Sequence, residues 1–537
     1  MALSDLEKTG RRPKLPLTIR LPGVGAPELH LESLLRVLPG RRYVGVALWS
    51  DRGLERKVLA KLLVGKKAKR DFMREKRGNR LLCEQDLSTP ALWADFFSEK
   101  EGGVLLFEYL EGAHSLGERW KALEDAARTD ALRVVKDAFC AVAELHSKGL
   151  WQEDLHPDNL LYQKPTPVEN LPLQGDNRGW ERRNLFHAVS PVHGRGLKHQ
   201  EGRLFFVDAG SVSSETPGSP LSPEKALENL GVFFAQFPSR IEGALQDWLD
   251  AYAEVNSSCR ARFTPSALRA AIDRAKRRRI DDLMKKTGRD CSLFRVEKKG
   301  FLGAFGFCAV RRDEAEALAR ILAEPDAFIA RGHIFKAGRT ATVARVEDRG
   351  RLFVVKRYNV KNFWHWLGRF WRPSRAWTSW RGGNRLDALG IPTAKPLAMI
   401  ERRWMGLRGT AYLITEYLEG RDIMTFFRDA QQEKAGIPPS LDIGIAALRE
   451  LFAALRRDRV SHGDFKGNNL IWRGGGDRGA WVLIDLDAMR AHHSASEFSS
   501  AYARDRDRLL RNWLQDSPVF RRLNAAIPAS ADERDEF

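Results

Sequence analysis

The chain contains Gln152-Glu153-Asp154-Leu155-His156-Pro157-Asp158-Asn159 and, 310 residues later, His462-Gly463-Asp464-Phe465-Lys466-Gly467-Asn468-Asn469. Both octapeptides have an aspartate five residues before an asparagine. The pentapeptide Glu-Tyr-Leu-Glu-Gly also occurs twice, at 108–112 and 416–420, with an offset of 308. Two matches in the same order and at nearly the same offset indicate two related units in tandem.

The sequence around each octapeptide predicts the same order of elements. Enrichment in Val, Leu and aromatic residues predicts two early strands in each unit, and an apolar strand then leads into the pentapeptide. An amphipathic helix precedes the octapeptide. The expected strands are 43–49, 57–64 and 104–107, then 342–346, 352–358 and 411–415, and the expected helices are 132–146 and 443–455. The sequence therefore predicts an α+β chain in which each unit has a β-rich N-lobe and a helical C-lobe.

Composition along the chain predicts the boundaries of these units. A stretch rich in Pro, Gly, Asn, Arg and His is typical of an inserted loop. We expect unit 1 at 1–290 (N-lobe about 1–107, C-lobe about 113–290, insertion 163–203), a linker at 291–325, and unit 2 at 326–537 (N-lobe about 326–415, C-lobe about 421–527).

The overall composition excludes several classes of protein. The 537 residues are 43% apolar and 30% charged, and the net charge of +19 favours anionic partners. No apolar run approaches 18 residues, and the polar N-terminus has no secretory signal pattern. The five cysteines form no CxxC or Cys/His cluster, which indicates reduced thiols and a cytoplasmic location.

The first unit contains residues suited to phosphoryl transfer, in the order Lys61, Glu75, Asp154, Asn159 and Asp208. In that chemistry a strand lysine contacts the phosphates of ATP and a helix glutamate holds the lysine. One aspartate accepts or orients the acceptor hydroxyl, while an asparagine and a second aspartate hold magnesium. The second unit offers Lys356, Asp464, Asn469 and Asp485 for the matching roles.

These motifs resemble those of the protein-kinase-like superfamily. Ser374-Arg375-Ala376, Trp380 and the following Gly390-Ile391-Pro392-Thr393 are similar to bacterial lipopolysaccharide core kinases of the Kdo/heptose kinase family. The resemblance implies two tandem kinase-like units that use ATP and Mg²⁺ to phosphorylate a sugar hydroxyl, with heptose the favoured acceptor, of the lipopolysaccharide inner core. It also implies work at the cytoplasmic face of the inner membrane.

The resemblance assigns the two pentapeptides to the hinge between lobes, where backbone groups would meet the adenine. The expected hinge residues are Glu108, Tyr109 and Leu110 in unit 1, and Glu416, Tyr417 and Leu418 in unit 2. Unit 2 departs from the superfamily pattern because it has no acidic residue between Ser374 and Leu386 to pair with Lys356, and because it has Asp485-Leu486-Asp487 in place of Asp-x-Gly. These departures favour unit 1 as the active unit.

Other interpretations remain open at this point. The protein could be a kinase of another small molecule or of protein Ser/Thr, or a pseudokinase scaffold in envelope biogenesis. The Trp-rich segment 363–380 could contact the membrane peripherally or pack in the core. Nucleic acid is not expected as a partner, because no nucleic-acid-binding signature is present. The sequence leaves the oligomeric state open.

Overall fold

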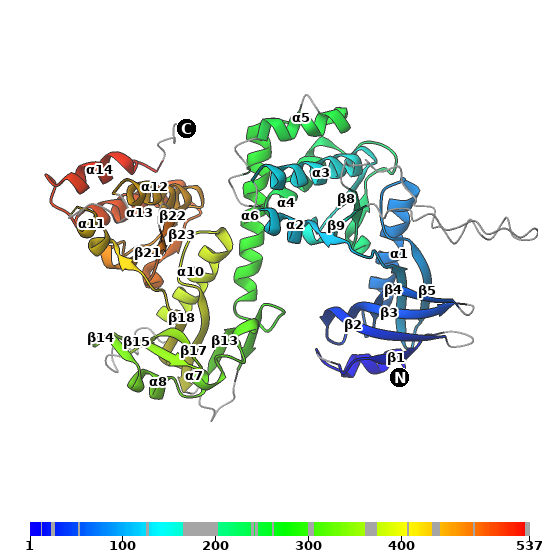
Figure 1. Cartoon of the computed structure of the whole chain (residues 1–537), viewed down its shortest axis with the longest axis horizontal. Helices are drawn as coiled ribbons and strands as arrows, with labels where there is room; N and C mark the ends of the chain where they lie inside the picture. Colours follow the sequence, from blue (N-terminus) through cyan, green and yellow to red (C-terminus); the bar gives the residue numbers. More distant parts are fainter. Residues whose placement is uncertain are drawn as a thin grey trace, which may run out of the picture. The chain divides into compact units, whose positions relative to one another are not determined.

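A computed structural model describes most of the chain. The described residues are 1–11, 13–22, 27–51, 54–124, 128–164, 202–237, 241, 245–259, 262–298, 306–359, 373–404, 407–431, 441–475 and 478–531. The chain divides into two compact units, Met1–Arg277 and Arg278–Phe537 (Figure 1). Each unit combines an antiparallel sheet with a mainly helical part, so the fold is mixed α and β.

Unit 1 begins with a six-stranded antiparallel sheet. Its strands, in spatial order, are β1 (Leu17–Arg20), β2 (Glu28–Leu38), β3 (Arg42–Asp51), β4 (Leu54–Leu63), β6 (Gly102–Glu108) and β5 (Leu92–Ser98). Helix α1 (Ala68–Glu84) follows β4, and its Phe72 packs with Leu105 and Phe107 of β6 on one face of the sheet. The other face is buried in a separate apolar cluster that includes Leu6, Tyr43 and Leu62.

The second part of unit 1 is mainly helical. Its helices are α2 (Leu116–Glu124), α3 (Arg128–Ser147), α4 (Pro223–Phe234), α5 (Leu245–Val255) and α6 (Pro265–Lys286), which ends in unit 2. The short strands are β7 (His114–Ser115), β8 (Leu150–Gln152), β9 (Leu160–Gln163), β10 (Arg203–Phe206) and β11 (Val212–Ser214). The antiparallel pairs β8–β11 and β9–β10 bring the first octapeptide beside the segment that contains Asp208.

Unit 2 has a seven-stranded antiparallel sheet. Its strands, in spatial order, are β12 (Phe294–Glu297), β13 (Phe307–Arg311), β17 (Pro396–Trp404), β18 (Leu407–Glu416), β16 (Arg351–Tyr358), β15 (Ala341–Asp348) and β14 (His333–Ala337). Helices α7 (Ala319–Ala323) and α8 (Pro325–Arg331) cover one face through Ile321 and Phe328. Helix α10 (Arg375–Leu389) covers the other face through Ala376 and Trp380.

The rest of unit 2 is mainly helical. It comprises β19 (Arg421–Asp422), α11 (Ile423–Gln431), α12 (Leu441–Arg457), β20 (Val460–Ser461), β21 (Leu470–Gly475), β22 (Arg478–Leu483), β23 (Arg490–Ala491), α13 (Ala495–Leu510) and α14 (Pro518–Ala526). Strands β21 and β22 pair antiparallel, and so do β20 and β23. These pairings place the second octapeptide beside Asp485 in the same way as in unit 1.

The strands and helices expected from the sequence are present, but the boundary between units differs from the expected one. Residues 291–325, expected as a linker, contribute β12, β13 and α7 to unit 2. The apolar run in β13 pairs with β17, because an added strand satisfies backbone hydrogen bonds and buries Phe307 and Val310. The expected insertion 163–203 lies almost entirely outside the described residues.

The Trp-rich segment is described only in part. Residues 363–371 lie outside the described residues. Trp380 is fully buried, packs edge-on against Phe294, and donates its indole N–H to the Thr287 carbonyl at 3.1 Å, while Trp377 packs on Phe307. Trp380 therefore belongs to the core, and the partly buried Trp377 packs against it. Among the described helices, none has the length and apolar character that crossing a membrane requires.

Candidate active site

In unit 1 the structure brings Lys61, Glu75 and Asp208 into contact. Lys61 lies on β4 and Glu75 on α1, and both side chains are buried. The Lys61 Nζ atom lies 2.7 Å from a Glu75 oxygen and 3.3 Å from an Asp208 oxygen. The Gly210 N–H also donates to Glu75 at 3.2 Å. The helix glutamate therefore fixes both the strand lysine and the turn that follows Asp208.

Arg42 adds a second cation that the sequence analysis did not assign to the site. Its guanidinium lies 3.3 Å from both Glu75 and Asp208. Burial opposes ionisation of Asp208, but Lys61 and Arg42 outweigh burial and lower the pKa of Asp208. Burial raises the pKa of Glu75, against the opposing effect of Lys61. Asp208 is therefore the more firmly ionised of the two carboxylates.

Asp154 and Asn159 lie beside this cluster in the octapeptide. The Asn159 amide donates to the Asp154 backbone carbonyl at 2.7 Å, and the Val207 N–H donates to the Asn159 carbonyl at 2.9 Å. The Gln152 amide donates to the Val207 carbonyl at 2.7 Å. The Asp154 side chain is exposed and forms no hydrogen bond or ion pair within the described part of the chain.

In unit 2 Lys356 pairs with Asp485 and Asp487 in place of a helix glutamate. Its Nζ atom lies 2.6 Å from Asp485 and 2.9 Å from Asp487. The Asp487 carboxylate also accepts from Tyr358 at 2.6 Å, from Ser379 at 2.7 Å and from Arg375. Burial opposes ionisation of Asp487, but Lys356 and Tyr358 outweigh burial and lower its pKa. The second aspartate of Asp485-Leu486-Asp487 therefore does what Glu75 does in unit 1.

Asp464 lies between two cationic side chains. One of its oxygens is 2.8 Å from the Arg508 guanidinium, and the other is 3.0 Å from the Lys466 Nζ atom. The Asn469 amide donates to the Asp464 carbonyl at 2.8 Å, as Asn159 does to Asp154. Arg508 also donates to the Gly463 carbonyl at 2.8 Å, so it holds both the backbone and the carboxylate of the octapeptide.

The two sites share an unusual backbone geometry. Asp208 and Asp485 both adopt the left-handed conformation, with φ values of 58° and 59°, and each is followed by one turn of 3₁₀ helix. This conformation is rare for a residue other than glycine and persists only where the surrounding contacts hold it. In unit 2 the His462 ring bonds the Ile484 carbonyl at 2.9 Å, as Gln152 bonds Val207 in unit 1. His462 is thus a structural hydrogen-bonding residue.

The pentapeptides begin at the last residues of β6 and β18, and the side chain of each first residue accepts a hydrogen bond from a neighbouring backbone N–H group. Glu108 accepts from the Ala91 N–H at 3.3 Å, and Glu416 accepts from the Lys395 N–H at 2.9 Å. Leu110 and Leu418 are buried. Tyr109 lies under the Lys57 ammonium, and Tyr417 stacks with Phe335. The glutamate side chains are therefore structural, and the Glu108 and Glu416 N–H groups donate to the Ala91 and Lys395 carbonyls.

A cleft of about 520 Å³ in unit 2 collects most of the expected site residues of that unit. Its lining includes Lys356, Glu416, Tyr417, Leu418, Asn469, Asp485 and Asp487. Apolar side chains, including Val343, Val354, Leu413 and Leu483, line it as well. A cleft of this size, with apolar walls and a few charged groups, suits a nucleotide.

The oxygen donors of each site suit magnesium. Mg²⁺ is bound in such sites by one or two protein oxygens together with substrate phosphates. Within the described ranges, no three His, Cys, Asp or Glu side chains form a group that could hold a metal by themselves. Asn469 uses its amide nitrogen on the Asp464 carbonyl, so its side-chain oxygen remains as a donor beside Asp485. The pair Asn159 and Asp208 has the same chemistry in unit 1.

Three side chains were missed from the sequence because their partners are remote in the chain. Arg42 is 166 residues from Asp208, Arg508 is 44 residues from Asp464, and Asp487 is 131 residues from Lys356. Only Asp487 carried a signal, since it follows Asp485 by two residues and unit 2 lacks a helix glutamate.

One comparison with known proteins matches a stretch that lies within the second unit. Residues 332–524 match the family model described as "Lipopolysaccharide kinase (Kdo/WaaP) family". A solved structure described as "WaaP in complex with acyl carrier protein" is similar at 19% identity over 41% of this chain and 90% of that chain, with a TM-score of 0.31. The matched residues include Lys356, Asp464, Asn469 and Asp485. Residues 332–524 of this chain are therefore similar to the lipopolysaccharide kinase (Kdo/WaaP) family.

Proposed function

We propose that this protein transfers the γ-phosphoryl group of ATP to a sugar hydroxyl of the lipopolysaccharide inner core, and that unit 2 is the catalytic unit. One observation carries the proposal. Within the residues that match the family, a cleft of nucleotide size is lined by Lys356, Asn469, Asp485 and the second pentapeptide. Both units are kinase-like in this proposal, because they share the element order and the Asp208 and Asp485 backbone geometry.

Each residue has a defined role in this reaction. Lys356 contacts the phosphates and is held by Asp487. The backbone of Glu416, Tyr417 and Leu418 meets the adenine. Asn469 and Asp485 would hold magnesium, which would neutralise charge on the phosphates.

The octapeptide handles the acceptor. Asp464, held by Lys466 and Arg508, orients the sugar hydroxyl and takes its proton. The sugar oxygen forms the new P–O bond while the bond to the β-phosphate oxygen breaks and ADP leaves. Positioning and charge neutralisation supply most of the rate gain.

The similarity of residues 332–524 to the lipopolysaccharide kinase family supports this choice of acceptor and location. Heptose is the first inner-core sugar to test. We place the reaction on the cytoplasmic side of the inner membrane, where ATP is present, with peripheral contact made through the lipid-anchored acceptor.

Unit 1 supports a second candidate role. In this proposal the matching residues are Lys61, Glu75, Asp154, Asn159 and Asp208, with the backbone of Glu108, Tyr109 and Leu110 at the adenine. However, Arg42 and Lys61 both pair with Asp208 and Arg36 lies 4.0 Å from it, so a metal ion competes with these cations for that carboxylate. This competition favours unit 1 as a non-catalytic scaffold and reverses the preference for unit 1 that the sequence motifs suggest.

The test is transfer of labelled γ-phosphate to purified core glycolipid. We expect Asp464→Asn to abolish transfer and Asp154→Asn to retain it, because the octapeptide that carries Asp464 also lines the nucleotide-sized cleft of unit 2 through Asn468 and Asn469. Cell protein and soluble sugars offered in parallel test the other acceptor classes. Transfer that survives in D464N but is lost in D154N assigns the chemistry to unit 1, and no transfer to any glycolipid by the wild type rejects the proposal.

A further inference from the structure

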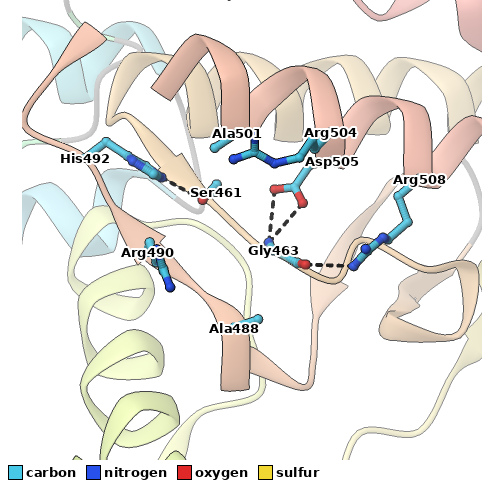
Figure 2. Close-up of a pocket in the computed structure, with 9 residues that line it drawn as sticks. All are labelled: Ser461, Gly463, Ala488, Arg490, His492, Ala501, Arg504, Asp505 and Arg508. Atoms are coloured by element: carbon cyan, nitrogen blue, oxygen red, sulfur yellow. Dashed lines mark hydrogen bonds between the residues drawn. The ribbon is translucent and has the colours of Figure 1, made fainter. Parts of the chain in front are cut away.

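A second cavity in unit 2, of about 300 Å³, lies beside the first residues of the second octapeptide (Figure 2). It is lined by Ser461, Gly463, Ala488, Arg490, His492, Ala501, Arg504, Asp505 and Arg508. Ala488 follows directly on Asp487, and Gly463 directly precedes Asp464. The cavity and the cleft therefore share the two short segments that carry the proposed reaction.

Four lining residues come from one face of α13, with the spacing 501, 504, 505 and 508 that places side chains on the same side of a helix. Figure 2 shows Asp505 and Arg508 reaching from this helix to Gly463. Gly463 has a φ of 78°, and a Cβ atom there would lie 2.5 Å from the Ala488 carbonyl oxygen. The position therefore has to lack a side chain, which keeps the floor of the cavity open.

The carboxylate in the cavity is already committed to backbone donors. Asp505 accepts from the His462 N–H at 2.6 Å and from the Gly463 N–H at 2.9 Å. Burial raises the pKa of Asp505, against the effect of these donors. Asp505 therefore anchors the octapeptide. Among the described residues, it forms no ion pair with an arginine that lines the cavity.

The cationic groups are left in excess. Arg508 pairs with Asp464, whereas Arg490 and Arg504 are exposed and form no ion pair or side-chain hydrogen bond within the part of the chain that the structure describes. Burial lowers the pKa of His492, and Arg490 and Arg504 lower it further against Glu497 and Asp505. His492 bonds the Ser461 hydroxyl at 2.8 Å. Among the described residues, Arg490 and Arg504 therefore have no ion-pair partner, while the Asp505 carboxylate of the same cavity accepts from backbone N–H groups.

We propose that this cavity binds an anionic group of the acceptor, a phosphate or carboxylate on the glycan, and so positions the neighbouring hydroxyl against Asp464. The inference rests on the proposed function. Guanidinium groups bind phosphate and carboxylate through paired N–H donors, which fits Arg490 and Arg504. Arg508 lines the cavity and also contacts Asp464. It therefore connects an anion bound in the cavity to the acceptor-orienting carboxylate.

The first experiment measures acceptor kinetics with the full-length protein. We expect Arg504→Gln and Arg490→Gln each to raise the KM for phosphorylated core glycolipid about tenfold, because each removes a charge-assisted hydrogen bond. The KM for ATP is the second readout, and it stays near the wild-type value. Arg511→Gln, an exposed arginine at the end of α13 that does not line the cavity, is the matched control. An acceptor KM in R504Q and R490Q equal to that of R511Q overturns the inference.

The second experiment separates the source of the anion. Inorganic phosphate is titrated against the protein while the His492 ring resonances are followed by NMR. Phosphate is expected to raise the His492 pKa in the wild type and in R511Q but not in the double variant R490Q/R504Q. Glycolipid treated to remove its phosphates then has the KM of R504Q if phosphate is recognised, and keeps the wild-type KM if the carboxylate is recognised.

Failure of the proposed function gives a different pattern. If the wild type phosphorylates no glycolipid, the proposed function is wrong, and the phosphate titration alone decides whether the cavity binds anions. A third outcome is an active wild type in which R490Q and R504Q leave the acceptor KM unchanged and phosphate leaves the His492 resonance unchanged. The proposed function then stands, and the cavity is not an acceptor subsite.

Discussion

At the scale of single residues, Asp487 holds Lys356 in the unit 2 cleft. Its carboxylate collects Lys356, Tyr358, Ser379 and Arg375, which come from β16 and α10. We expect Asp487→Asn to lower kcat/KM for ATP about 100-fold, because a misplaced Lys356 no longer meets the phosphates. Steady-state kinetics checks this prediction, with the exposed Asp507→Asn as control. Kinetics in D487N within twofold of the wild type would contradict the assigned role.

His146 is the second residue with a measurable consequence. It is fully buried between Tyr252 and Asn229, each 3.0 Å from a ring nitrogen, and Asn229 in turn donates to the Gln152 carbonyl. Burial lowers the pKa of His146 to about 4, against the Asn229 hydrogen bond that raises it. The ring is therefore neutral in the folded protein at neutral pH.

This pKa predicts the pH dependence of stability. Between pH 6.5 and about 4 the unfolded chain binds a proton at His146 that the folded chain does not. The free energy of unfolding therefore falls as the pH falls through this window, by about 3 kcal/mol in total. Urea unfolding at pH 7, 6 and 5 checks this, and His146→Asn flattens the slope. The exposed His114→Asn is the control, and an equal slope in H146N and the wild type would reject the prediction.

At the scale of elements, the contact of α1 with the turn after Asp208 is tight enough to exclude a methyl group. A Cβ atom at Gly78 would lie 1.8 Å from the Ala209 carbonyl oxygen. Glycine in a helix normally costs about 1 kcal/mol relative to alanine, so a gain is expected on propensity alone. The clash with Ala209 reverses the sign of the expected change in stability.

We therefore expect Gly78→Ala to destabilise unit 1 by about 1–3 kcal/mol, because the turn that carries Asp208 has to move. Denaturant unfolding measures the change, and Arg77→Ala, an exposed neighbour on the same helix, is the control with an effect under about 0.5 kcal/mol. A G78A protein more stable than the wild type would show that α1 and the turn are not packed as described.

At the scale of the whole molecule, each unit has its own apolar cores and is expected to unfold with its own transition. ATP with Mg²⁺ at 100 times Kd stabilises the unit that binds it by about 2.7 kcal/mol. We expect this gain in the unit 2 transition and its loss in Lys356→Met. Scanning calorimetry measures it, and G78A identifies which transition belongs to unit 1. A shift confined to the unit 1 transition would place the nucleotide site there.

The sequence determined the two repeated peptides, the expected strands and helices, and the residue types of both candidate sites, because these depend on local patterns and on order along the chain. Lys61 and Glu75 could be paired in advance, since they are 14 residues apart on consecutive elements. The tertiary structure alone decided what surrounds them. Arg42 on Asp208, Arg508 on Asp464, the replacement of a helix glutamate by Asp487, and the inclusion of β12 and β13 in the second sheet all depend on long-range packing. Charge and hydrogen-bond energies depend on distances of a few ångströms in space. The separation of two residues along the chain does not predict those distances.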